Sequence, residues 1–227
     1  MTLAVVTGAS RGIGRATALG LAARGVDLAL VARDGAGLAD AAAAATASGV
    51  LARSFPCDLF DTEALRATAM AVRAELGNPD LLINNAGIAT SCPVTELTPE
   101  HVDLHLAVNL RAPMLLSAAF VGAMRRRGHG RILHVASIAA TVGTPLRAAY
   151  NASKWGLVGF MRSLAAELAD SGVVTLAVLP GSVDTDMLRG SGFAPRMTAE
   201  AVARTLVHYA LDAPAAHNGA VIEMFGV

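Results

Sequence analysis

Tyr150 and Lys154 stand four residues apart, so a helix over this segment places both side chains on one face. A phenol with an ordinary pKa of about 10 holds its proton too tightly to cycle near neutral pH. A nearby ammonium favours the phenolate, and we therefore expect Lys154 to lower the pKa of Tyr150. Such a pair suits proton exchange with a substrate oxygen, which the reduction of a carbonyl by hydride transfer requires.

Ser137 follows the apolar segment 132–135, which is predicted to be a strand. Side chains at the carboxyl ends of parallel strands lie where α/β sheets bind ligands, and a hydroxyl there can hydrogen-bond a substrate oxygen. A Tyr-x-x-x-Lys pair alone is common on solvated helix faces. The combination with Ser137, thirteen positions upstream, is far more specific.

Residues 7–14, Thr-Gly-Ala-Ser-Arg-Gly-Ile-Gly, connect the first apolar run to the first helical pattern. Glycines permit a tight turn and a close approach of the backbone to a pyrophosphate, and the helix N-terminus offers free N–H groups to phosphates. Ordinary tight turns also contain glycine clusters. The position between a first strand and a first helix favours a nucleotide site.

The spacing Thr-Gly-x-x-x-Gly-x-Gly, followed by Ser137, Tyr150 and Lys154 in this order, resembles the short-chain dehydrogenase/reductase family in its standard, non-extended branch. The resemblance covers essentially the whole chain. It implies a serine–tyrosine–lysine triad, with Lys154 also holding the nicotinamide ribose hydroxyls. It further implies that Asn109 supports a water in the proton relay. A buried asparagine that bonds the backbone is the simpler interpretation of Asn109, and the two roles are compatible.

The resemblance also implies a set of cofactor-binding positions. Asp58 matches the residue that bonds the adenine amino group, while Val183 and Thr185 match those that hold the nicotinamide carboxamide. Taken alone, Asp58 is also a possible helix N-cap, and Pro180-Gly181 is also an ordinary turn. The expected cofactor-binding residues are Gly8, Ser10, Arg11, Gly12, Ile13, Gly14, Arg33, Asp58, Leu59, Asn85, Ala86, Gly87, Tyr150, Lys154, Pro180, Gly181, Val183 and Thr185.

The second predicted strand ends without the acidic residue that NAD-binding family members place against the adenosine ribose. Ala32 occupies that position, and Arg33 follows it. Arg11 is the second basic residue expected in reach of a 2′-phosphate, so we expect NADP(H) to be favoured over NAD(H). Both arginines have simpler interpretations, as a solvated loop charge and a helix-start residue. Asp34 is the main objection, unless it caps the next helix.

The elements that must position these residues alternate as strand and helix. The expected fold class is α/β: a Rossmann-type, doubly wound, mainly parallel seven-stranded sheet with helices on both faces, in a single domain spanning residues 1–227. Predicted strands cover residues 3–6, 26–31, 50–56, 81–83, 132–135, 173–179 and 221–224. Predicted helices cover 12–23, 37–47, 62–76, an interrupted region 99–127, 150–169 and 198–211.

Composition excludes several functional classes. Apolar residues make up 54% of the 227 residues, and the formal net charge is zero, which argues against nucleic acid and anionic membranes as partners. The Arg125–Arg127 run precedes Gly128, as expected of a solvated helix C-terminus. No signal peptide is recognisable, and no run reaches the ~18 uninterrupted apolar residues of a membrane span. We therefore expect a cytoplasmic protein.

Cysteine and histidine usage is interpreted in structural terms. Cys57 and Cys92 are predicted to be reduced, buried thiols. His101 and His105 stand at i and i+4, half of a metal site. No third ligand stands at useful spacing, so we expect exposed helix histidines and no metal.

The segment after Thr185 departs from the family pattern. About a dozen residues stand where the family usually has a two-helix lid, and the usual Asp-Gly-Gly tail is absent. Because of both departures, the substrates and the four-subunit assembly of other family members are a weaker guide for this protein. From position, the substrate pocket is predicted to be apolar, with Arg147 as the nearest charge. The predicted lining is Ile138, Ala139, Val142, Pro145, Leu146, Met187 and Leu188.

These observations predict an oxidoreductase that acts on a small carbonyl or alcohol and forms a homodimer or homotetramer through residues 114–124 and 157–168. Two alternatives remain at this point. One is an epimerase or dehydratase on the same fold, although the extended branch has a different glycine spacing. The other is a catalytically silent nucleotide-sensing or scaffold protein, which has no need of Asn109, Ser137, Tyr150 and Lys154 together.

Overall fold

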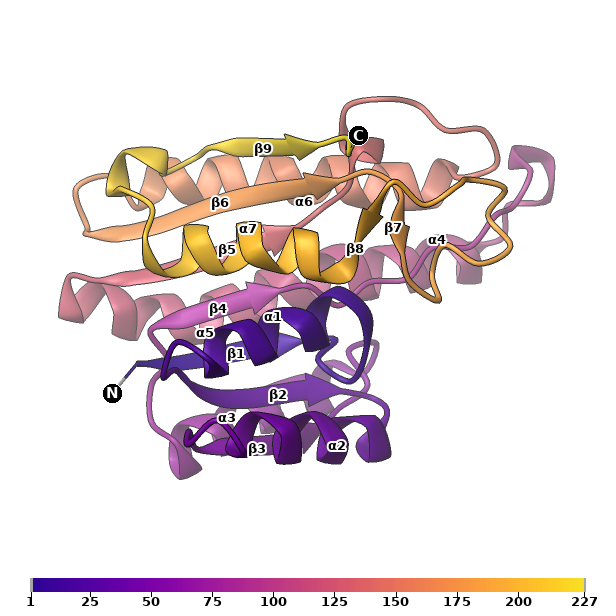
Figure 1. The fold of residues 1–227 in the computed structure, drawn as a ribbon. Helices are drawn as coiled ribbons and strands as arrows, with labels where there is room; N and C mark the ends of the chain where they lie inside the picture. The colour runs from indigo at the N-terminus through magenta and orange to yellow at the C-terminus, as the bar shows by residue number, and fades with distance from the viewer. Residues whose placement is uncertain (1, 227) are drawn as a thin grey trace.

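The computed structural model describes residues 2–226, and its centre is a parallel sheet of seven strands in the order β3-β2-β1-β4-β5-β6-β9 (Figure 1). Strand order reverses between β1 and β4, which opens a crevice at the carboxyl ends of these two strands. The strands are β1 Leu3–Thr7, β2 Asp27–Ala32, β3 Ala52–Pro56, β4 Leu81–Asn84, β5 Gly130–Val135, β6 Val173–Pro180 and β9 Val221–Met224.

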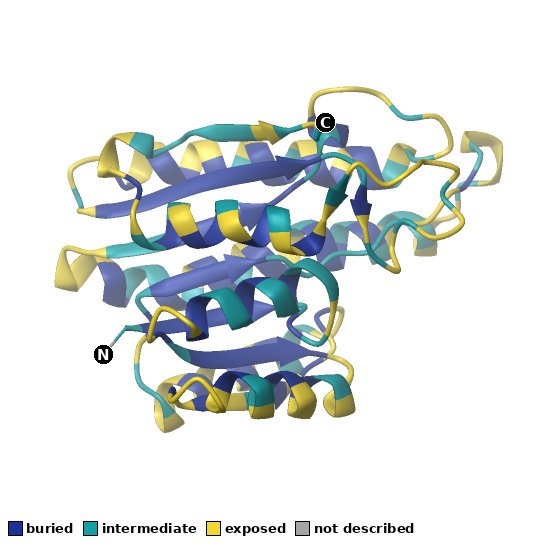
Figure 2. Ribbon diagram, in the orientation of Figure 1, coloured by how far each residue is buried: buried dark blue, intermediate teal, exposed yellow. Residues whose placement is uncertain are grey.

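Helices cover both faces of the sheet, and the five central strands are almost wholly buried, whereas the edge strands β3 and β9 are partly exposed (Figures 1 and 2). Neighbouring residues of one strand face opposite layers: Val6 packs with α1, α2 and α7, whereas Val5 packs with α3, α5 and α6. This explains why the strands are continuously apolar in sequence. The helices are α1 Gly12–Ala22, α2 Gly35–Thr46, α3 Thr62–Glu75, α4 Pro99–Leu106, α5 Ala112–Arg127, α6 Ala148–Glu167 and α7 Ala199–Leu211.

The predicted fold class is confirmed, and every predicted strand is present with small shifts at its ends. The third strand starts at Ala52 rather than at residue 50. The second helix starts at Gly35, two residues early, because Asp34 caps it by accepting a hydrogen bond from Gly37 N at 3.1 Å. A small parallel pair, β7 Val183–Asp184 and β8 Met197–Thr198, was not predicted, since two residues carry no periodicity.

The interrupted helical region is one continuous run with a π-helical turn, η2 Ala107–Arg111, between α4 and α5. The run Pro99–Arg127 is long and apolar enough to cross a membrane by length and composition alone. Half of its most apolar window is buried inside the protein, and α5 contributes Leu116 and Phe120 to the core. A core helix of the sheet's back layer therefore accounts for this segment.

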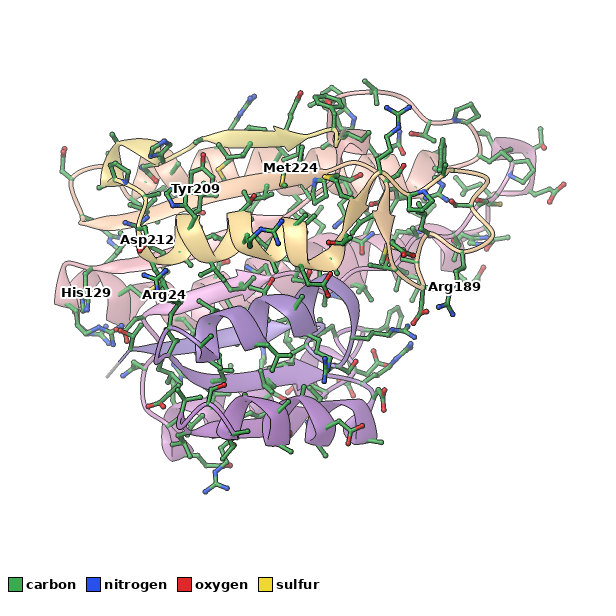
Figure 3. All side chains as sticks on the ribbon, viewed as in Figure 1. Arg24, His129, Arg189, Tyr209, Asp212 and Met224 are labelled. Atoms are coloured by element: carbon green, nitrogen blue, oxygen red, sulfur yellow. The ribbon has the colours of Figure 1, made fainter. Side chains whose placement is uncertain are left out.

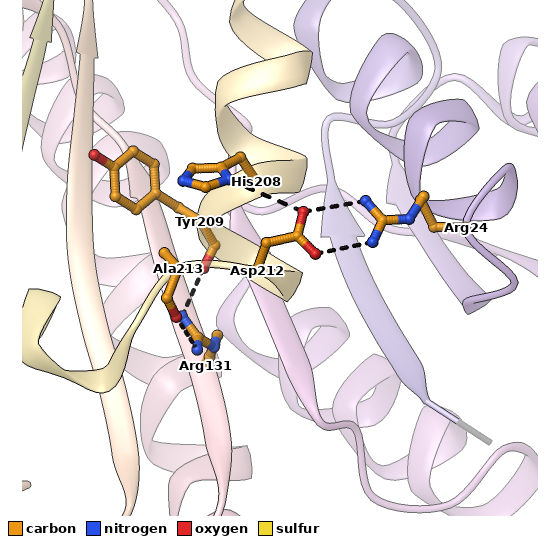
Figure 4. A network of polar contacts seen from close by, with 6 residues as sticks. All are labelled: Arg24, Arg131, His208, Tyr209, Asp212 and Ala213. Atoms are coloured by element: carbon orange, nitrogen blue, oxygen red, sulfur yellow. Dashed lines mark hydrogen bonds and ion pairs between the residues drawn. The ribbon is translucent and has the colours of Figure 1, made fainter.

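Charged side chains join the helices at the amino ends of the strands. Arg24, just beyond α1, forms two hydrogen bonds with Asp212, just beyond α7, and the shorter is 2.8 Å (Figure 4). Arg131 at the start of β5 donates to the backbone oxygens of Tyr209, at 2.9 Å, and Ala213. These contacts attach the end of α7 to α1 and to β5. In Figure 3, Arg24, Tyr209 and Asp212 lie at the end of the molecule opposite Arg189.

Candidate active site

Tyr150 lies in the first turn of α6, near the carboxyl end of β5. Its side chain is buried, and the Nζ atom of Lys154 lies 5.9 Å from its ring centroid. The N-terminus of α6 has no side-chain cap and no acidic residue in its first turn, within residues 2–226. The positive end of the helix dipole therefore acts on the phenol, which favours a negative oxygen there.

Burial raises the pKa of Tyr150 above its ordinary value, and a hydrogen bond with Ser137 and the charge of Arg147 oppose this rise. The predicted lowering of this pKa by Lys154 is therefore wrong for the protein alone, because burial outweighs the nearby charges. The cation that opposes this rise in the pKa of Tyr150 is Arg147.

Lys154 is buried at the junction of β5 and the loop after β4. Its Nζ donates a hydrogen bond to Val135 O at 2.9 Å, and burial lowers its pKa to about 8. A Cβ atom on Gly87 would lie 3.4 Å from this Nζ, so glycine leaves the ammonium room. The neighbouring His134 is fully buried on β5, and burial, with the charge of Lys154, lowers its pKa to about 3.

Asn109 lies in the π-helical turn and is completely buried. Its Oδ1 accepts from Ile88 N at 2.9 Å, and its Nδ2 donates to Ile88 O and to Ser153 Oγ, both at 3.0 Å. Ser153 Oγ in turn donates to Tyr150 O. The backbone-bonding interpretation of Asn109 is thus confirmed. Ser153, which sequence reasoning missed, links Asn109 to the first turn of α6. Its position three residues after Tyr150 on the same predicted helix could have identified it.

Ser137 follows β5 and begins a short 3-10 turn, η3 Ile138–Ala140. Its Oγ accepts a hydrogen bond from Ala139 N at 3.2 Å, which orients the hydroxyl, and it also interacts with the Tyr150 phenol. Ser137, Tyr150, Lys154 and Asn109 therefore come from three segments: the turn after β5, the start of α6 and the π-helical turn.

The glycine loop, residues 7–14, has the shape that a pyrophosphate requires. Gly8 takes φ +66, and a Cβ there would lie 2.8 Å from Asn85 Nδ2, while a Cβ on Gly14 would overlap the Gly8 carbonyl oxygen. Asn85 holds the loop by donating from Nδ2 to Thr7 O at 2.8 Å. In the described part of the chain, the N-terminus of α1 has neither a side-chain cap nor an acidic residue in its first turn. A dinucleotide phosphate therefore fits this cradle.

The remaining predicted cofactor residues lie around the same crevice. Gly12 takes φ +55 and a Cβ on it would lie 3.3 Å from Thr185 Cγ2, which places the glycine loop against the loop after β7. Ser10 lies against the start of α2. Asp58 is exposed and accepts from Phe60 N at 3.0 Å, so it does not cap α3, since Asp61 does. Also located at the carboxyl ends of the strands are Ile13, Leu59, Ala86, Gly87, Pro180, Gly181 and Val183.

The two arginines expected near a 2′-phosphate differ in their surroundings. Arg11 Nη1 forms an ion pair with Asp186 Oδ2 at 3.2 Å, so its guanidinium turns toward the loop after β7. Arg33 is exposed directly after β2, with no carboxylate within salt-bridge distance in residues 2–226. Asp34 points its carboxylate at the start of α2 as the helix cap.

His105 is buried beside Tyr150, which corrects the expectation of an exposed helix histidine. The ring centroids lie 6.5 Å apart in an edge-on arrangement. Its Nδ1 donates to His101 O at 2.8 Å, and its Nε2 accepts from Thr90 N at 3.2 Å, which requires the neutral ring. In the described residues no cluster of three or more metal-ligating side chains is present. Cys57 and Cys92 are free and buried, as predicted.

Among the residues predicted to line the pocket, the larger apolar side chains remain partly exposed. Val142, Leu146 and Met187 expose about half of their surface, which leaves apolar area available to a ligand. Arg147 lies among them, with its Cζ 5.9 Å from the Tyr150 ring centroid and 5.7 Å from that of Phe193. Phe193 was missed, since the segment 185–196 carries no periodic pattern. Residues 185–196 contain no α-helix in this structure, so the usual two-helix lid is absent.

A family model described as short chain dehydrogenase matches residues 2–193, which span the glycine loop and the Ser137–Lys154 segment. The chain belongs to the short-chain dehydrogenase family. It is 38% identical to the 3-oxoacyl-[acyl-carrier-protein] reductase of Escherichia coli K12, over 82% of this chain and 75% of that protein. It is 36% identical to the D-threitol dehydrogenase of Mycolicibacterium smegmatis, over 99% of this chain and 91% of that protein.

Solved structures agree in fold over nearly the full length. A metagenomic short-chain oxidoreductase in complex with NADP superposes with a TM-score of 0.88 at 35% identity, covering 100% of this chain and 97% of the other. A putative short-chain alcohol dehydrogenase from Sinorhizobium meliloti superposes with a TM-score of 0.91 at 30% identity, covering 98% and 94%. The protein is thus a nicotinamide-dependent oxidoreductase that acts on CH–OH or C=O groups of small molecules.

Proposed function

We propose that this short-chain dehydrogenase uses NADP(H) to interconvert a ketone or aldehyde and an alcohol on a small, largely apolar substrate, with Tyr150 as the proton donor and acceptor. The observation that carries the proposal is the convergence of Tyr150, Ser137, Lys154 and Asn109 beside the glycine loop. One dinucleotide-binding domain carries both sites. The elements that bring them together are the carboxyl ends of β1, β4 and β5 and the N-terminus of α6.

When bound, the nicotinamide supplies or accepts the hydride. Tyr150 gives its phenolic proton to the substrate oxygen during reduction and takes it back during oxidation. Ser137 is oriented by Ala139 N and hydrogen-bonds the same oxygen as charge develops on it. The uncapped N-terminus of α6 stabilises the phenolate between turnovers.

Lys154 contributes to this cycle through its hydrogen-bond donors and its proton. An ammonium has three donors, and one is engaged by Val135 O, so two can meet ribose hydroxyls or a water. A pKa of about 8 lets Lys154 exchange a proton near neutral pH. Asn109 holds the backbone of Ile88 and, through Ser153, the start of α6 in register with this lysine.

Three observations support a preference for NADPH. Arg33 follows β2 as an exposed residue, and Ser10 lies against Gly37 in the first turn of α2. Asp34, the one carboxylate nearby in sequence, is used as a helix cap rather than against a ribose. The metagenomic relative was solved with NADP. Arginine and phosphate form charge-assisted hydrogen bonds, which NADH cannot make.

The apolar rim of Val142, Leu146, Met187 and Phe193 supports an uncharged, apolar carbonyl compound as substrate. The test is NADPH oxidation against a panel of ketones, aldehydes, β-keto esters and quinones. Turnover is expected with apolar ketones or β-keto esters. A strong preference for acidic substrates that is lost in Arg147→Ala would overturn the apolar substrate class. Tight NADPH binding without turnover of any carbonyl would indicate a nucleotide-sensing protein instead.

For assembly we expect a homodimer or homotetramer in the cytoplasm. On α5 and α6, Phe120 and Met161 are completely buried in the chain's own core. Met114 and Trp155 stay exposed on the two helices and are the apolar contacts that a second copy would bury. Light scattering at micromolar concentration tests this, and a monomer there would contradict it.

A further inference from the structure

Arg147 stands between two aromatic rings that belong to different parts of the site. Its Cζ lies 5.9 Å from the ring centroid of Tyr150 on α6 and 5.7 Å from that of Phe193 in the segment 185–196. Both distances fall within the ~6 Å range of a cation–π contact. One guanidinium thus bridges the proton donor and the segment that borders the substrate pocket.

The backbone around Arg147 is held in a strained turn. Leu146 takes φ +63, a left-handed conformation that is costly for leucine. Cys92 N donates to Leu146 O at 2.7 Å, and Asn151 N donates to Arg147 O at 2.8 Å. Contacts on both sides therefore fix the residue that places the guanidinium over Tyr150.

The other groups that face Tyr150 have defined partners. Lys154 donates to Val135 O, Ser137 accepts from Ala139 N, and His105 is held neutral by its two ring hydrogen bonds. Arg147 has no carboxylate within salt-bridge distance anywhere in residues 2–226. No carboxylate in the described residues therefore competes with the two rings for this guanidinium.

We propose that Arg147 is a positioning residue of the reaction: it holds the ring of Tyr150 and, through Phe193, couples the placement of the segment 185–196 over the substrate to the alignment of the phenol. This inference rests on the proposed role of Tyr150 in proton exchange. The same cation opposes the burial that raises the pKa of Tyr150, so its loss makes the phenolate harder to form.

The test compares alcohol oxidation by the purified protein and its Arg147→Met, Arg147→Lys and Arg204→Met variants across a pH series. Oxidation requires the phenolate, so in Arg147→Met the activity should rise at higher pH than in the natural protein. Its kcat near pH 7 should fall roughly threefold to tenfold. Arg147→Lys keeps the charge and should restore the pH profile. Arg204→Met removes an exposed arginine from α7, on the opposite face of the sheet, and should change neither.

Phe193→Leu tests the coupling to the segment 185–196. It should raise KM about twofold to fivefold with an unchanged pH profile, and this effect should be clearly smaller when Arg147→Met is already present. An unchanged pH profile in folded Arg147→Met, or independent effects of the two substitutions, overturns the inference. Wild-type turnover in Tyr150→Phe would overturn the proposed function itself, so the two failures are distinguishable.

Discussion

The charged groups at the two ends of the parallel strands differ in burial and in the direction of their pKa shifts. At the amino ends, Arg24 and Asp212 pair at 2.8 Å, and Asp80 pairs with Arg127 at 3.2 Å. The Arg24 and Asp212 side chains stay 49% and 42% exposed, so both remain hydrated while paired. Arg24 holds the pKa of the Asp212 carboxyl below its usual range, mainly through their hydrogen bond. Charges at these ends therefore sit in their preferred ionisation states.

At the carboxyl ends, Tyr150 and Lys154 are buried and displaced from their ordinary pKa values, although Arg11 and Arg33 stay exposed there. Burial raises the pKa of Tyr150 and lowers that of Lys154 to about 8. Each shift means that the charged form is less stable in the folded protein than in water. The buried, displaced pair therefore lies at the proposed site of proton exchange, whereas the exposed ion pair lies at the opposite end of the sheet.

The largest expected effect is that of Tyr150→Phe. Removal of the phenolic oxygen eliminates the proton donor while the ring keeps its packing, so kcat should fall about a hundredfold to ten-thousandfold with an unchanged Tm. Steady-state kinetics measure the fall in kcat, and thermal denaturation checks that Tm is unchanged. Near wild-type rates in the folded variant would show that another group carries the proton.

Lys154→Met should abolish most activity and yet stabilise the protein. The folded pKa of about 8 lies below the ordinary 10.5, so at neutral pH the natural protein holds a buried ammonium that the unfolded chain hydrates better. Its replacement should raise the free energy of unfolding by about 1–3 kcal/mol. The natural protein gains stability as pH rises from 8 to 10.5, so the advantage of the variant should shrink there.

Urea denaturation at pH 7 and at pH 10 measures this difference. Lys154 is the only lysine in the sequence, so its own titration can be followed by NMR after selective ¹³C-methylation of the amine. A midpoint near its ordinary value, together with a loss of stability in Lys154→Met, would show that the ammonium is hydrated and stabilising.

A moderate effect is expected of Arg33→Ala on cofactor choice. The natural protein should prefer NADPH to NADH in kcat/KM, and the substitution should shrink this preference by roughly tenfold, since one charge-assisted hydrogen bond to phosphate is lost. Arg66→Ala is the matched control, because Arg66 lies exposed on α3 and pairs with Glu63 there. Equal use of both cofactors by the natural protein would place Asp34, not Arg33, at the ribose.

The smallest effect is expected at the amino ends of the strands. Arg24→Ala and Asp212→Ala should leave turnover unchanged and lower Tm only slightly, because a hydrated ion pair contributes little. The depressed pKa of Asp212 means that its contribution is present at neutral pH and lost as pH falls through the folded pKa. Thermal denaturation at neutral and at acidic pH measures it. A large loss of turnover in either variant would contradict the separation of the two ends.

Much of this molecule was determined by local sequence pattern. Continuous apolar strands that alternate with amphipathic helices require a parallel sheet covered on both faces, and the glycines at 8, 12 and 14 require a tight turn before α1. The spacing of Tyr150 and Lys154 likewise placed both on one face of α6, because a helix repeats every 3.6 residues. These features depend on neighbours in sequence, so they could be predicted.

Only the tertiary structure decided how buried each polar group is and what it faces. The burial of His105, the link from Asn109 to Ser153, and the contact of Arg147 with Phe193 join segments that no periodicity relates. The shift of the Tyr150 pKa reversed the sequence-based expectation for the same reason. Desolvation depends on every chain segment packed around a group, whereas charge and spacing can be read along one segment.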